Sequence, residues 1–415
     1  MVENNSRKVE IMSPAGNFEN LRAAIQGGAD SIYFGVGKLN MRSRSANNFM
    51  LEDLPQIADI CGESGIKTYL TLNTIMFDED ISLMRSTVDA AKSAGLTAVI
   101  ASDQAVIAYS ANVGVEIHLS TQINISNFES LRFYAQYADV AVLARELNLD
   151  QVKAIHRKII EQDLRGPSGA PIRIEMFAHG ALCMAVSGKC YLSLHEYASS
   201  ANRGGCYQTC RRSYLLSDKE TGAEIAVNNE YLMSPKDLCT ISFIDKMISS
   251  GVGVLKIEGR ARSSEYVKAT TQCYREAVQA VEDGAYTSDK IKAWTEKLSS
   301  VFNRGFWDGY YLGRRLGEWS VSYGNQASKR KIYLGKITNY FASVKVAEIL
   351  IESGELKLGD EIVVNGPTTG LVELVVDELR VEMKSVEKAV KGEYCSVKIP
   401  EKVRCSDKLY KMELQ

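Results

Sequence analysis

Residues 10–35 read EIMSPAGNFENLRAAIQGGADSIYFG, and this stretch decides the fold class. A short, mostly apolar run at residues 10–13 is followed by residues 17–26, where apolar side chains recur at helical spacing. A second β-branched run follows at residues 31–34. Two glycines separate the last two segments, and glycine there can adopt the left-handed conformation that ends a helix. The stretch therefore predicts a strand, a helix and a second strand.

The same pattern recurs up to about residue 280. Strands are predicted at residues 10–13, 31–34, 67–72, 98–101, 116–119, 140–144, 173–177 and 254–257. Helices are predicted between them at residues 17–26, 51–63, 81–94, 127–137, 149–160 and 241–249. This repetition favours the α/β class and a (β/α)8 TIM-like barrel. An open sheet stays as the alternative, because a strand pattern does not show closure.

One unit carries a cysteine-rich insertion, residues 180–239, between the seventh predicted strand and the helix that follows it. Within the insertion, residues 213–217 and 224–228 predict a β-hairpin. A long excursion from a compact scaffold more often carries function than not. The barrel with its insertion is predicted to span residues 1–321.

Beyond the barrel the pattern changes to short strands and tight turns. The polar residues 322–331 predict a linker, and residues 332–415 predict a small all-β, barrel-like domain. The chain is therefore expected to contain two domains.

The composition limits the class of protein. The chain is 45% hydrophobic and 24% charged, with a net charge of −2, as expected of a globular protein that does not bind nucleic acid over its whole surface. Its first ten residues are polar, and no stretch reaches the roughly 18–20 apolar residues of a membrane helix. We therefore expect a cytoplasmic protein without membrane contact. In that reducing compartment its nine cysteines are not expected to form disulfides.

The cysteines of the insertion indicate a metal site. Cys183, Cys190, Cys206 and Cys210 lie close together in the sequence, and Cys239 follows at the end of the insertion. Zinc sites usually pair their ligands as C-x2–4-C, which only Cys206 and Cys210 satisfy. Iron–sulfur clusters take four thiolates and accept wider spacings. Buried, inert cysteine is the remaining alternative.

The run Glu175-x-Phe-x-x-Gly-Ala-Leu-Cys183-x6-Cys190-x-Leu-Ser193 resembles the signature of the collagenase-like "unclassified peptidase" family. The resemblance extends over most of the first 320 residues through further motifs: SPAG at 13–16, YFG at 33–35, AREL at 144–147, SPKDL at 234–238, KIEGR at 256–260 and FNRG at 302–305. The chain length and the C-terminal β-domain are most similar to the branch of tRNA hydroxylation proteins.

This resemblance implies an activity and a cofactor. Proteins of that branch convert the wobble uridine of tRNA to 5-hydroxyuridine in a prephenate-dependent reaction, and relatives hydroxylate a ribosomal RNA cytidine or a quinone precursor. The resemblance implies a 4Fe-4S cluster on Cys183, Cys190, Cys206 and Cys239, with Cys210 as the competing fourth ligand. Prephenate and the tRNA anticodon loop become the expected partners, together with a paralogous subunit, because some relatives are heterodimers.

Polar side chains follow the predicted strands, at the end where the active sites of such barrels form. Arginine binds carboxylates in bidentate fashion, and prephenate carries two. The predicted substrate-binding residues are Arg42, Asn73, Gln122, Arg145, Glu258 and Arg260. Glu175 and His179 are the predicted acid–base residues, since each can move a proton near neutral pH if its pKa is shifted.

The insertion also combines basic and aromatic residues, as single-stranded RNA sites do. The predicted RNA-binding residues are Lys189, Arg203, Arg211 and Arg212. Two other functions compete with RNA hydroxylation. A peptidase would need a nucleophile and a histidine, and Cys183 with His179 could serve. The chain could also be a non-catalytic, cluster-bearing subunit of a related hydroxylase.

Overall fold

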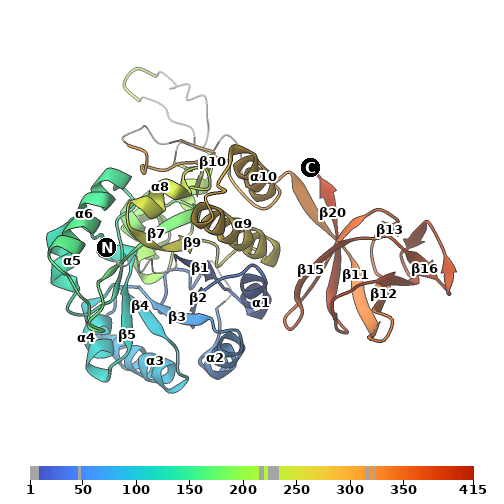
Figure 1. The fold of residues 1–415 in the computed structure, drawn as a ribbon, viewed down its shortest axis with the longest axis horizontal. Helices are drawn as coiled ribbons and strands as arrows, with labels where there is room; N and C mark the ends of the chain where they lie inside the picture. The colour runs from blue at the N-terminus through green and yellow to red at the C-terminus, as the bar shows by residue number, and fades with distance from the viewer. Residues whose placement is uncertain (1–8, 45–47, 215–218, 223–232, 314–317, 321–323) are drawn as a thin grey trace.

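The structure is a computed structural model that describes residues 9–44, 48–214, 219–222, 233–313, 318–320 and 324–415 (Figure 1). Within these residues, eight parallel strands form a barrel: β1 (Glu10–Pro14), β2 (Ser31–Gly35), β3 (Lys67–Leu72), β4 (Ala98–Ala101), β5 (Glu116–Leu119), β6 (Val140–Val142), β7 (Arg173–Gly180) and β9 (Val252–Ile257). Successive strands pair in parallel, and β9 pairs with both β1 and β7. The ring is therefore closed, which confirms the predicted barrel and excludes the open sheet.

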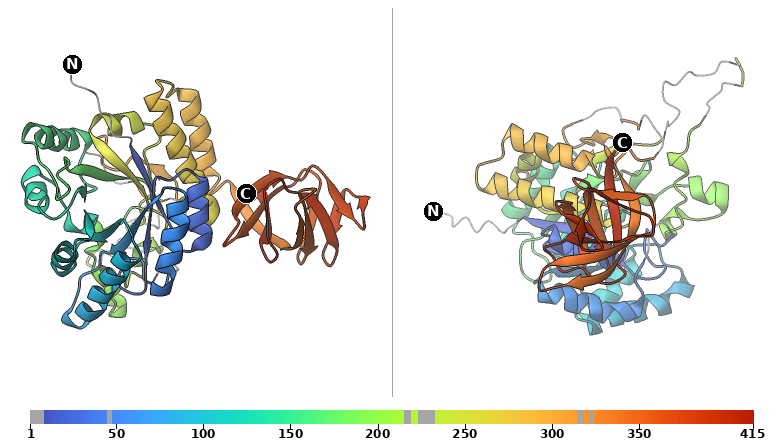
Figure 2. Two further views of the ribbon diagram at one scale, coloured as in Figure 1. Left: turned by 60° about the horizontal axis from the view of Figure 1, so that its bottom comes forward. Right: turned by 90° about the vertical axis from the view of Figure 1, so that its right-hand side faces the viewer.

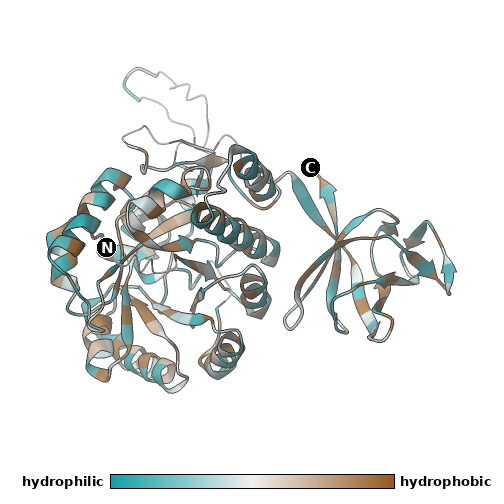
Figure 3. Ribbon diagram, in the orientation of Figure 1, coloured by the Kyte–Doolittle hydropathy of each residue, from teal (hydrophilic) through white to brown (hydrophobic). Residues whose placement is uncertain are grey.

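Helices surround the barrel (Figure 1). They are α1 (Phe18–Gln26), α2 (Leu54–Glu63), α3 (Ile81–Ser93), α4 (Gln104–Val113), α5 (Phe128–Tyr134), α6 (Leu149–Glu161), α8 (Ile244–Ser249), α9 (Ser264–Glu282) and α10 (Ser288–Ser299). Figure 3 shows hydrophilic and hydrophobic residues alternating along these helices, as expected when one face packs on the barrel. Asn17, predicted as the first residue of this helix, is its N-cap, and its side chain accepts a hydrogen bond from the backbone N–H of Asn20.

Some predicted boundaries differ from the observed ones. The strand predicted at 140–144 ends at Val142, and the helices predicted at 127–137 and 241–249 are shorter, as α5 and α8. Helix ends depend on capping contacts that a periodic pattern does not encode. No helix within the described ranges is long and apolar enough to cross a membrane.

The interior of the barrel mixes apolar and charged side chains. Because side chains alternate along a strand, every second residue faces inward. Met12, Tyr69 and Val254 belong to one buried apolar cluster of the interior. Glu175 and Lys256 lie among them and form a buried ion pair. This ion pair lies inside the barrel, and Lys256 also lines the pocket described below.

The insertion follows β7. It contains the short elements η4 (Val186–Gly188), α7 (Leu192–Tyr197), η5 (Ala201–Arg203) and η6 (Thr209–Arg211), and it ends at β8 (Asp237–Cys239). Strand β8 pairs antiparallel with β7 and parallel with β10 (Phe306–Trp307). Most of the predicted hairpin falls on residues 215–218 and 223–232, outside the described residues.

The C-terminal region is antiparallel and all-β, as predicted. Its strands are β11 (Lys329–Phe341), β12 (Val346–Ile351), β13 (Glu355–Lys357), β14 (Glu361–Gly366), β15 (Gly370–Val375), β16 (Leu379–Val381), β17 (Lys384–Ser385), β18 (Lys388–Val390), β19 (Tyr394–Lys398) and β20 (Lys408–Leu414). They enclose a hydrophobic core of their own. Strand β11 begins inside the stretch predicted as a linker. Figure 2 shows this domain beside α1 and α9, at the flank of the barrel.

Candidate functional site

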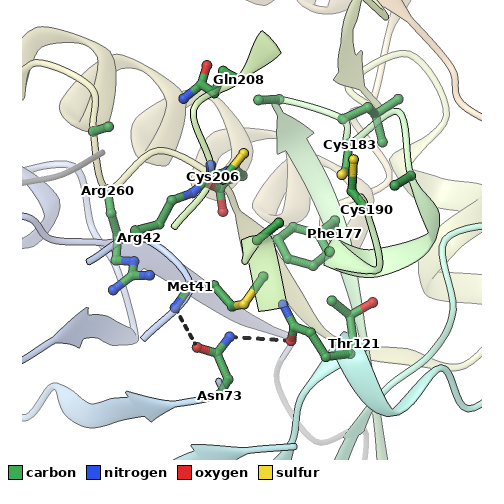
Figure 4. A pocket seen from close by; sticks show the side chains of 18 of the residues that line it. Met41, Arg42, Asn73, Thr121, Phe177, Cys183, Cys190, Cys206, Gln208 and Arg260 are labelled. Atoms are coloured by element: carbon green, nitrogen blue, oxygen red, sulfur yellow. Dashed lines mark hydrogen bonds and ion pairs between the residues drawn. The ribbon is translucent and has the colours of Figure 1, made fainter. Parts of the chain in front are cut away.

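A pocket opens where the barrel strands end, and the insertion forms its other wall (Figure 4). From the barrel, inward-facing residues such as Tyr33, Thr71 and Phe177 line it. From the insertion, Cys183 and Gln208 line it. The C-terminal ends of the strands and a long loop thus meet at one cavity, which is where barrels of this type place their active sites.

Arg42 and Glu258 form an ion pair in the wall of the pocket. The Arg42 Nε and Nη2 atoms donate to Glu258 Oε1 at 3.0 and 2.6 Å, and the Tyr33 hydroxyl donates to Glu258 Oε2 at 3.2 Å. Burial raises the pKa of Glu258, but Arg42, Arg260 and Arg145 outweigh it and bring that pKa to about 2. Glu258 is therefore ionised at neutral pH and neutralises much of the charge of Arg42.

Arg260 is buried in the same wall. Its Nη1 atom donates to Asn40 Oδ1 at 2.9 Å and to Thr71 Oγ1 at 3.1 Å. A Cβ atom on Gly35 would lie 2.3 Å from that Nη1, so glycine leaves the space that the guanidinium occupies. Burial lowers the pKa of Arg260 to about 10. Its Nε–H lacks a hydrogen-bond partner among the described residues, which leaves a donor for a ligand.

Arg145 lines the same pocket. Its guanidinium carbon is 3.8 Å from the centre of the Phe177 ring, and its Nη1 atom donates to the Ala181 carbonyl at 3.3 Å. Its Nε–H also lacks a partner within the described chain. Stacking fixes the plane of the guanidinium and leaves its donors available.

Cations outnumber carboxylates in the wall of the pocket. The lining cations are Arg42, Arg145, Arg211, Lys256, Arg260, Arg262 and Arg304. Glu258 is the one carboxylate among the described lining residues. Behind the wall, Asp237 pairs with two of the arginines, and Glu175 pairs with Lys256. The excess of positive charge suits an anionic ligand.

Asn73 and Gln122 also line the pocket. Asn73 Oδ1 accepts a hydrogen bond from the Met41 backbone N–H at 3.2 Å, and its Nδ2 donates to Gln122 Oε1 at 3.3 Å (Figure 4). Asn73 thereby holds the segment that carries Arg42 against the barrel. The structure brings all six predicted substrate-binding residues to one cavity.

Four cysteines of the insertion line the pocket: Cys183, Cys190, Cys206 and Cys210. Figure 4 shows Cys183 and Cys190 next to each other, with Cys206 between them and Arg42. Burial raises the pKa of the Cys210 thiol to about 11, although the adjacent Arg211 lowers it. In the described part of the chain these thiols do not form a preassembled group of metal ligands.

Cys239, predicted as the fourth ligand, lies elsewhere. It belongs to β8, is buried, and its Sγ atom is 3.9 Å from the Tyr274 hydroxyl of α9. It does not line the pocket, whereas Cys210 does. The antiparallel pairing of β8 with β7 turns Cys239 toward the outer helices, and the sequence spacing did not reveal this pairing.

The two predicted acid–base residues do not line the pocket. Glu175 is fully buried inside the barrel, where its Oε1 atom lies 2.7 Å from Lys256 Nζ. A register shift in β7 between Phe177 and His179 turns the histidine outward. There it packs against aromatic rings of the outer layer, and burial lowers the pKa of His179 to about 3. A neutral, enclosed imidazole cannot deliver a proton to the pocket.

The predicted RNA-binding arginines mainly hold the insertion in place. Arg203 donates to Asp80 Oδ2 at 2.7 Å, and its guanidinium lies 3.6 Å from the centre of the Phe77 ring. Arg211 donates to the Leu182 carbonyl at 2.6 Å. Both side chains are thus occupied by contacts within the protein.

Arg212 and Lys189 are the exposed members of that set. Arg212 Nη1 lies 2.6 Å from Glu196 Oε1, in an ion pair open to solvent. Two positions after Lys189, Tyr191 is 80% exposed. An exposed cation near an exposed ring is the remaining feature of this surface that suits single-stranded RNA.

Lys256 is a site residue that sequence reasoning missed. It lines the pocket, and its Nζ atom is 4.7 Å from the centre of the Tyr33 ring. The signal was present, because Lys256 lies two positions before the predicted Glu258 and must face the same side of the strand.

The family model of peptidase family U32 matches residues 16–320. The chain belongs to peptidase family U32. This U32 protein is 59% identical over 409 residues to a protein of Porphyromonas gingivalis named Collagenase, and the match covers 99% of each chain. It is 32% identical over 385 residues to tRNA hydroxylation protein P1 of Bacillus subtilis, covering 90% of this chain and 88% of that one.

A third relative is the 23S rRNA 5-hydroxycytidine C2501 synthase of Escherichia coli. It is 33% identical over 320 residues, which cover 75% of this U32 chain and 46% of the relative. The predicted family is confirmed. Relatives of this U32 protein thus carry the names of RNA-hydroxylating proteins as well as the name of a collagenase.

Proposed function

We propose that this U32 protein hydroxylates an RNA pyrimidine, converting the wobble uridine of tRNA to 5-hydroxyuridine with prephenate as co-substrate. The observation that carries the proposal is the pocket itself. Its wall is rich in arginine, and four cysteines of one insertion stand around it. A relative named for tRNA hydroxylation matches along 90% of the chain, so the same pocket is expected in both proteins.

The cysteines fit a 4Fe-4S cluster in number and in donor chemistry, since such a cluster takes four thiolates. Cys183, Cys190, Cys206 and Cys210 would hold it, because they share one cavity and Cys239 does not. When bound, the cluster would supply redox or Lewis-acid chemistry beside the pocket. The nearby arginines would offset the negative charge of the thiolates.

Prephenate fits the charge of the wall, because it carries two carboxylates. Arg42 is already paired with Glu258. Arg145 and Arg260 each keep a buried N–H donor without a partner in the described chain, so these two are the better carboxylate ligands. Asn73 and Gln122 offer amide groups to the rest of the molecule.

The RNA base would have to leave its stack to reach the cavity. The insertion lies at the opening of the pocket, and its Lys189 and Tyr191 side chains are exposed to solvent. With a net charge of −2, the protein would contact the RNA backbone locally and with modest salt dependence.

Peptidase activity is the second candidate, favoured by the name of the relative at 59% identity. Cysteine and serine peptidases need a histidine beside the nucleophile. None of the described residues that line the pocket is a histidine, and His179 packs in the outer layer with Tyr266 and Tyr274. The arginine-rich wall suits an anionic ligand, whereas the peptide bond that a peptidase cleaves is neutral.

Mass spectrometry of tRNA nucleosides tests the proposal. A strain that lacks this gene and any paralogue should lose 5-hydroxyuridine and its derivatives. The wild-type gene should restore them, and a Cys190→Ser gene should not. Purified protein with gelatin provides the test of the peptidase alternative. Unchanged 5-hydroxyuridine derivatives in the deletion strain would overturn the tRNA assignment. Restoration that requires a paralogue would identify the chain as a subunit.

A further inference from the structure

A line of polar side chains crosses the barrel from the pocket to the opposite face. Lys256 Nζ lies in the pocket wall, 2.7 Å from Glu175 Oε1. Glu175 Oε2 lies 3.6 Å from His118 Nδ1. His118 Nε2 lies 3.3 Å from Glu116 Oε1. Strands β5, β7 and β9 contribute these groups, all of which face inward by the alternation of side chains.

The middle of this line is enclosed and the far end is open. The side chains of Glu175 and His118 are 0% and 1% exposed, and that of Glu116 is 41% exposed. Glu116 and His118 line a second cavity at the N-terminal face of the barrel. The line therefore joins two cavities that the barrel core otherwise separates.

Two atoms in the line face each other without a hydrogen bond. Neither His118 Nδ1 nor Glu175 Oε2 has a hydrogen-bond partner within the described residues. A small approach of the two side chains would close the gap between them. Buried charged groups of this kind contribute little to stability compared with apolar residues of the same size. A role in proton transfer accounts for these buried charges, whereas packing alone does not.

The neighbouring groups shift the pKa values of His118 and Glu175. Burial lowers the pKa of His118, but Glu116 and Glu175 outweigh it and raise that pKa above its ordinary value. Burial raises the pKa of Glu175, while Lys256 and His118 bring it below its ordinary value. The ring of Tyr69 also packs on His118, with centroids 4.3 Å apart.

Further charges lie behind Tyr69. Its hydroxyl donates to Glu10 Oε1 at 2.7 Å, and Glu10 is paired with Arg173 and Lys67. Together Glu10, Arg173 and Lys67 carry a net charge of +1, which does not favour a proton on His118. Glu116 and Glu175 are therefore the groups that favour a proton on His118.

We propose that Lys256 exchanges a proton with the substrate in the pocket, and that Glu175, His118 and Glu116 connect it to water at the N-terminal face. This role rests on the proposed hydroxylation, in which a proton must be moved at the substrate. The Lys256 ammonium gives one proton to a substrate atom and becomes an amine. Glu175 takes the Nδ1 proton of His118 and passes one to the amine, which leaves a neutral His118 with its remaining proton on Nε2. A rotation of the His118 side chain then lets the vacant Nδ1 take a proton from Glu116 or water and return to its starting position. One proton crosses the barrel, and no electrons are transferred.

Kinetics of three variants provide the first test. Glu175→Gln and His118→Gln keep the shape of the core but interrupt proton transfer, and Lys256→Met removes the group in the pocket. Each should lower kcat by roughly 100-fold, as loss of an acid–base group does, with the KM for prephenate within about twofold of wild type. Circular dichroism should show unchanged folding.

The pH profile separates a relay from a structural ion pair. A plot of kcat against pH should show the titration of His118 in the wild type. This titration should be absent in His118→Gln. Glu79→Gln, an exposed carboxylate outside the line, is the matched control and should retain the wild-type profile. Loss of kcat and KM together with an unchanged profile would overturn the proposal.

A second measurement does not depend on the reaction. The chain has four histidines, so nitrogen NMR of labelled histidine in the full-length protein can follow His118, assigned by its loss in His118→Gln. In Lys256→Met, Glu175 no longer pairs with a cation, so its negative charge should stabilise the protonated form of His118 more strongly. The titration of His118 should therefore move to higher pH. An unmoved titration would overturn the relay even if tRNA hydroxylation is found. A moved titration without hydroxylation would leave the relay intact and reject only the proposed reaction.

Discussion

Cys210 and Cys239 differ in the surroundings of their thiols. Cys210 lines the pocket next to Arg211, a neighbour that favours a thiolate. Burial raises the pKa of both thiols to about 11, but Cys239 lies outside the pocket, beside the Tyr274 hydroxyl under α9. For the proposed cluster we therefore expect Cys210 as the fourth ligand, because Cys239 could join Cys183 only if β8 moved.

The first prediction is that protein purified without oxygen is brown and holds about four iron and four sulfide per chain. Cys210→Ser should lose most of the iron, because it removes a thiolate from the shared cavity. Cys239→Ser should retain it, and serves as the matched control. Iron analysis and visible absorption give the answer. Iron lost only from Cys239→Ser, or stoichiometric zinc in colourless protein, would contradict this assignment.

Arg145→Ala tests the anion site. Arg145 stacks on Phe177 with an unpartnered N–H, so its removal takes away a charge-assisted contact to a carboxylate. Binding of prephenate, measured by calorimetry, should weaken roughly 10- to 100-fold, as expected for a hydrogen bond to a charged group. Arg157→Ala on α6, whose side chain is exposed, should leave the affinity unchanged. Equal affinities in the two variants would remove Arg145 from the site.

At the scale of elements, the predicted strands matched the observed ones closely, because β-branched runs between glycine turns are a strong local signal. Helix α4 was not predicted, since its sequence QAVIAYSANV is apolar on most sides and lacks a clear stripe. The polar residues of the rim were predictable from strand ends. The position of His179 was not, because it depends on a register shift between β7 and β9.

Arg211 connects the two ends of the insertion. Its Nη2 donates to the Leu182 carbonyl near the start of the insertion, at 2.6 Å. Its Nη1 donates to Ser234 Oγ, near the end of the insertion, at 3.1 Å. The side chain is partly buried, so these contacts are shielded in part from solvent. These contacts indicate that Arg211 orders the insertion, and its predicted role in binding RNA stays a prediction.

Arg211→Ala should accordingly loosen the insertion. Loss of three charged hydrogen bonds, to Leu182, Ser234 and Pro235, each contributing about 1.5–3 kcal/mol, should raise amide hydrogen exchange at least tenfold in residues 181–214 and lower the iron content. Arg212→Ala removes only a solvent-exposed pair with Glu196 and should exchange like wild type. If Arg211→Ala reduces tRNA binding and leaves hydrogen exchange unchanged, the original RNA-binding prediction is correct.

At the scale of the whole molecule, the two ends of the barrel carry two different cavities. The C-terminal ends of the strands hold the pocket, and the N-terminal face carries Glu10 in a second cavity. The all-β domain attaches at the flank, where Asn365 Nδ2 donates to Glu19 Oε2 of α1 at 3.0 Å. The pocket was predicted from the strand ends, whereas the Glu10 cavity and the contact between Asn365 and Glu19 could not be read from local patterns, because each joins residues distant in sequence.

Glu10 makes stability depend on pH. It accepts a hydrogen bond from Tyr69 and pairs with Arg173 Nη1 at 2.8 Å and Lys67 Nζ at 3.2 Å. Burial raises the pKa of Glu10, but the two cations outweigh it and lower that pKa from 4.5 to about 2. A carboxyl whose pKa is lower in the folded state stabilises the fold above pH 4.5 and loses this contribution as pH falls toward 2.

Glu10→Gln should therefore be less stable than wild type at pH 7, by on the order of 3 kcal/mol in the free energy of unfolding. The difference should shrink as pH falls from 4.5 toward 2, where the wild-type carboxyl becomes protonated as well. Denaturant unfolding of both proteins at pH 7, 4.5 and 3, followed by circular dichroism, measures it. Glu129→Gln on α5, whose ion pair with Arg132 is exposed, should follow wild type at every pH. A difference between Glu10→Gln and wild type that stays constant with pH would mean that the variant acts through packing, because a packing defect has no reason to follow the protonation of one carboxyl.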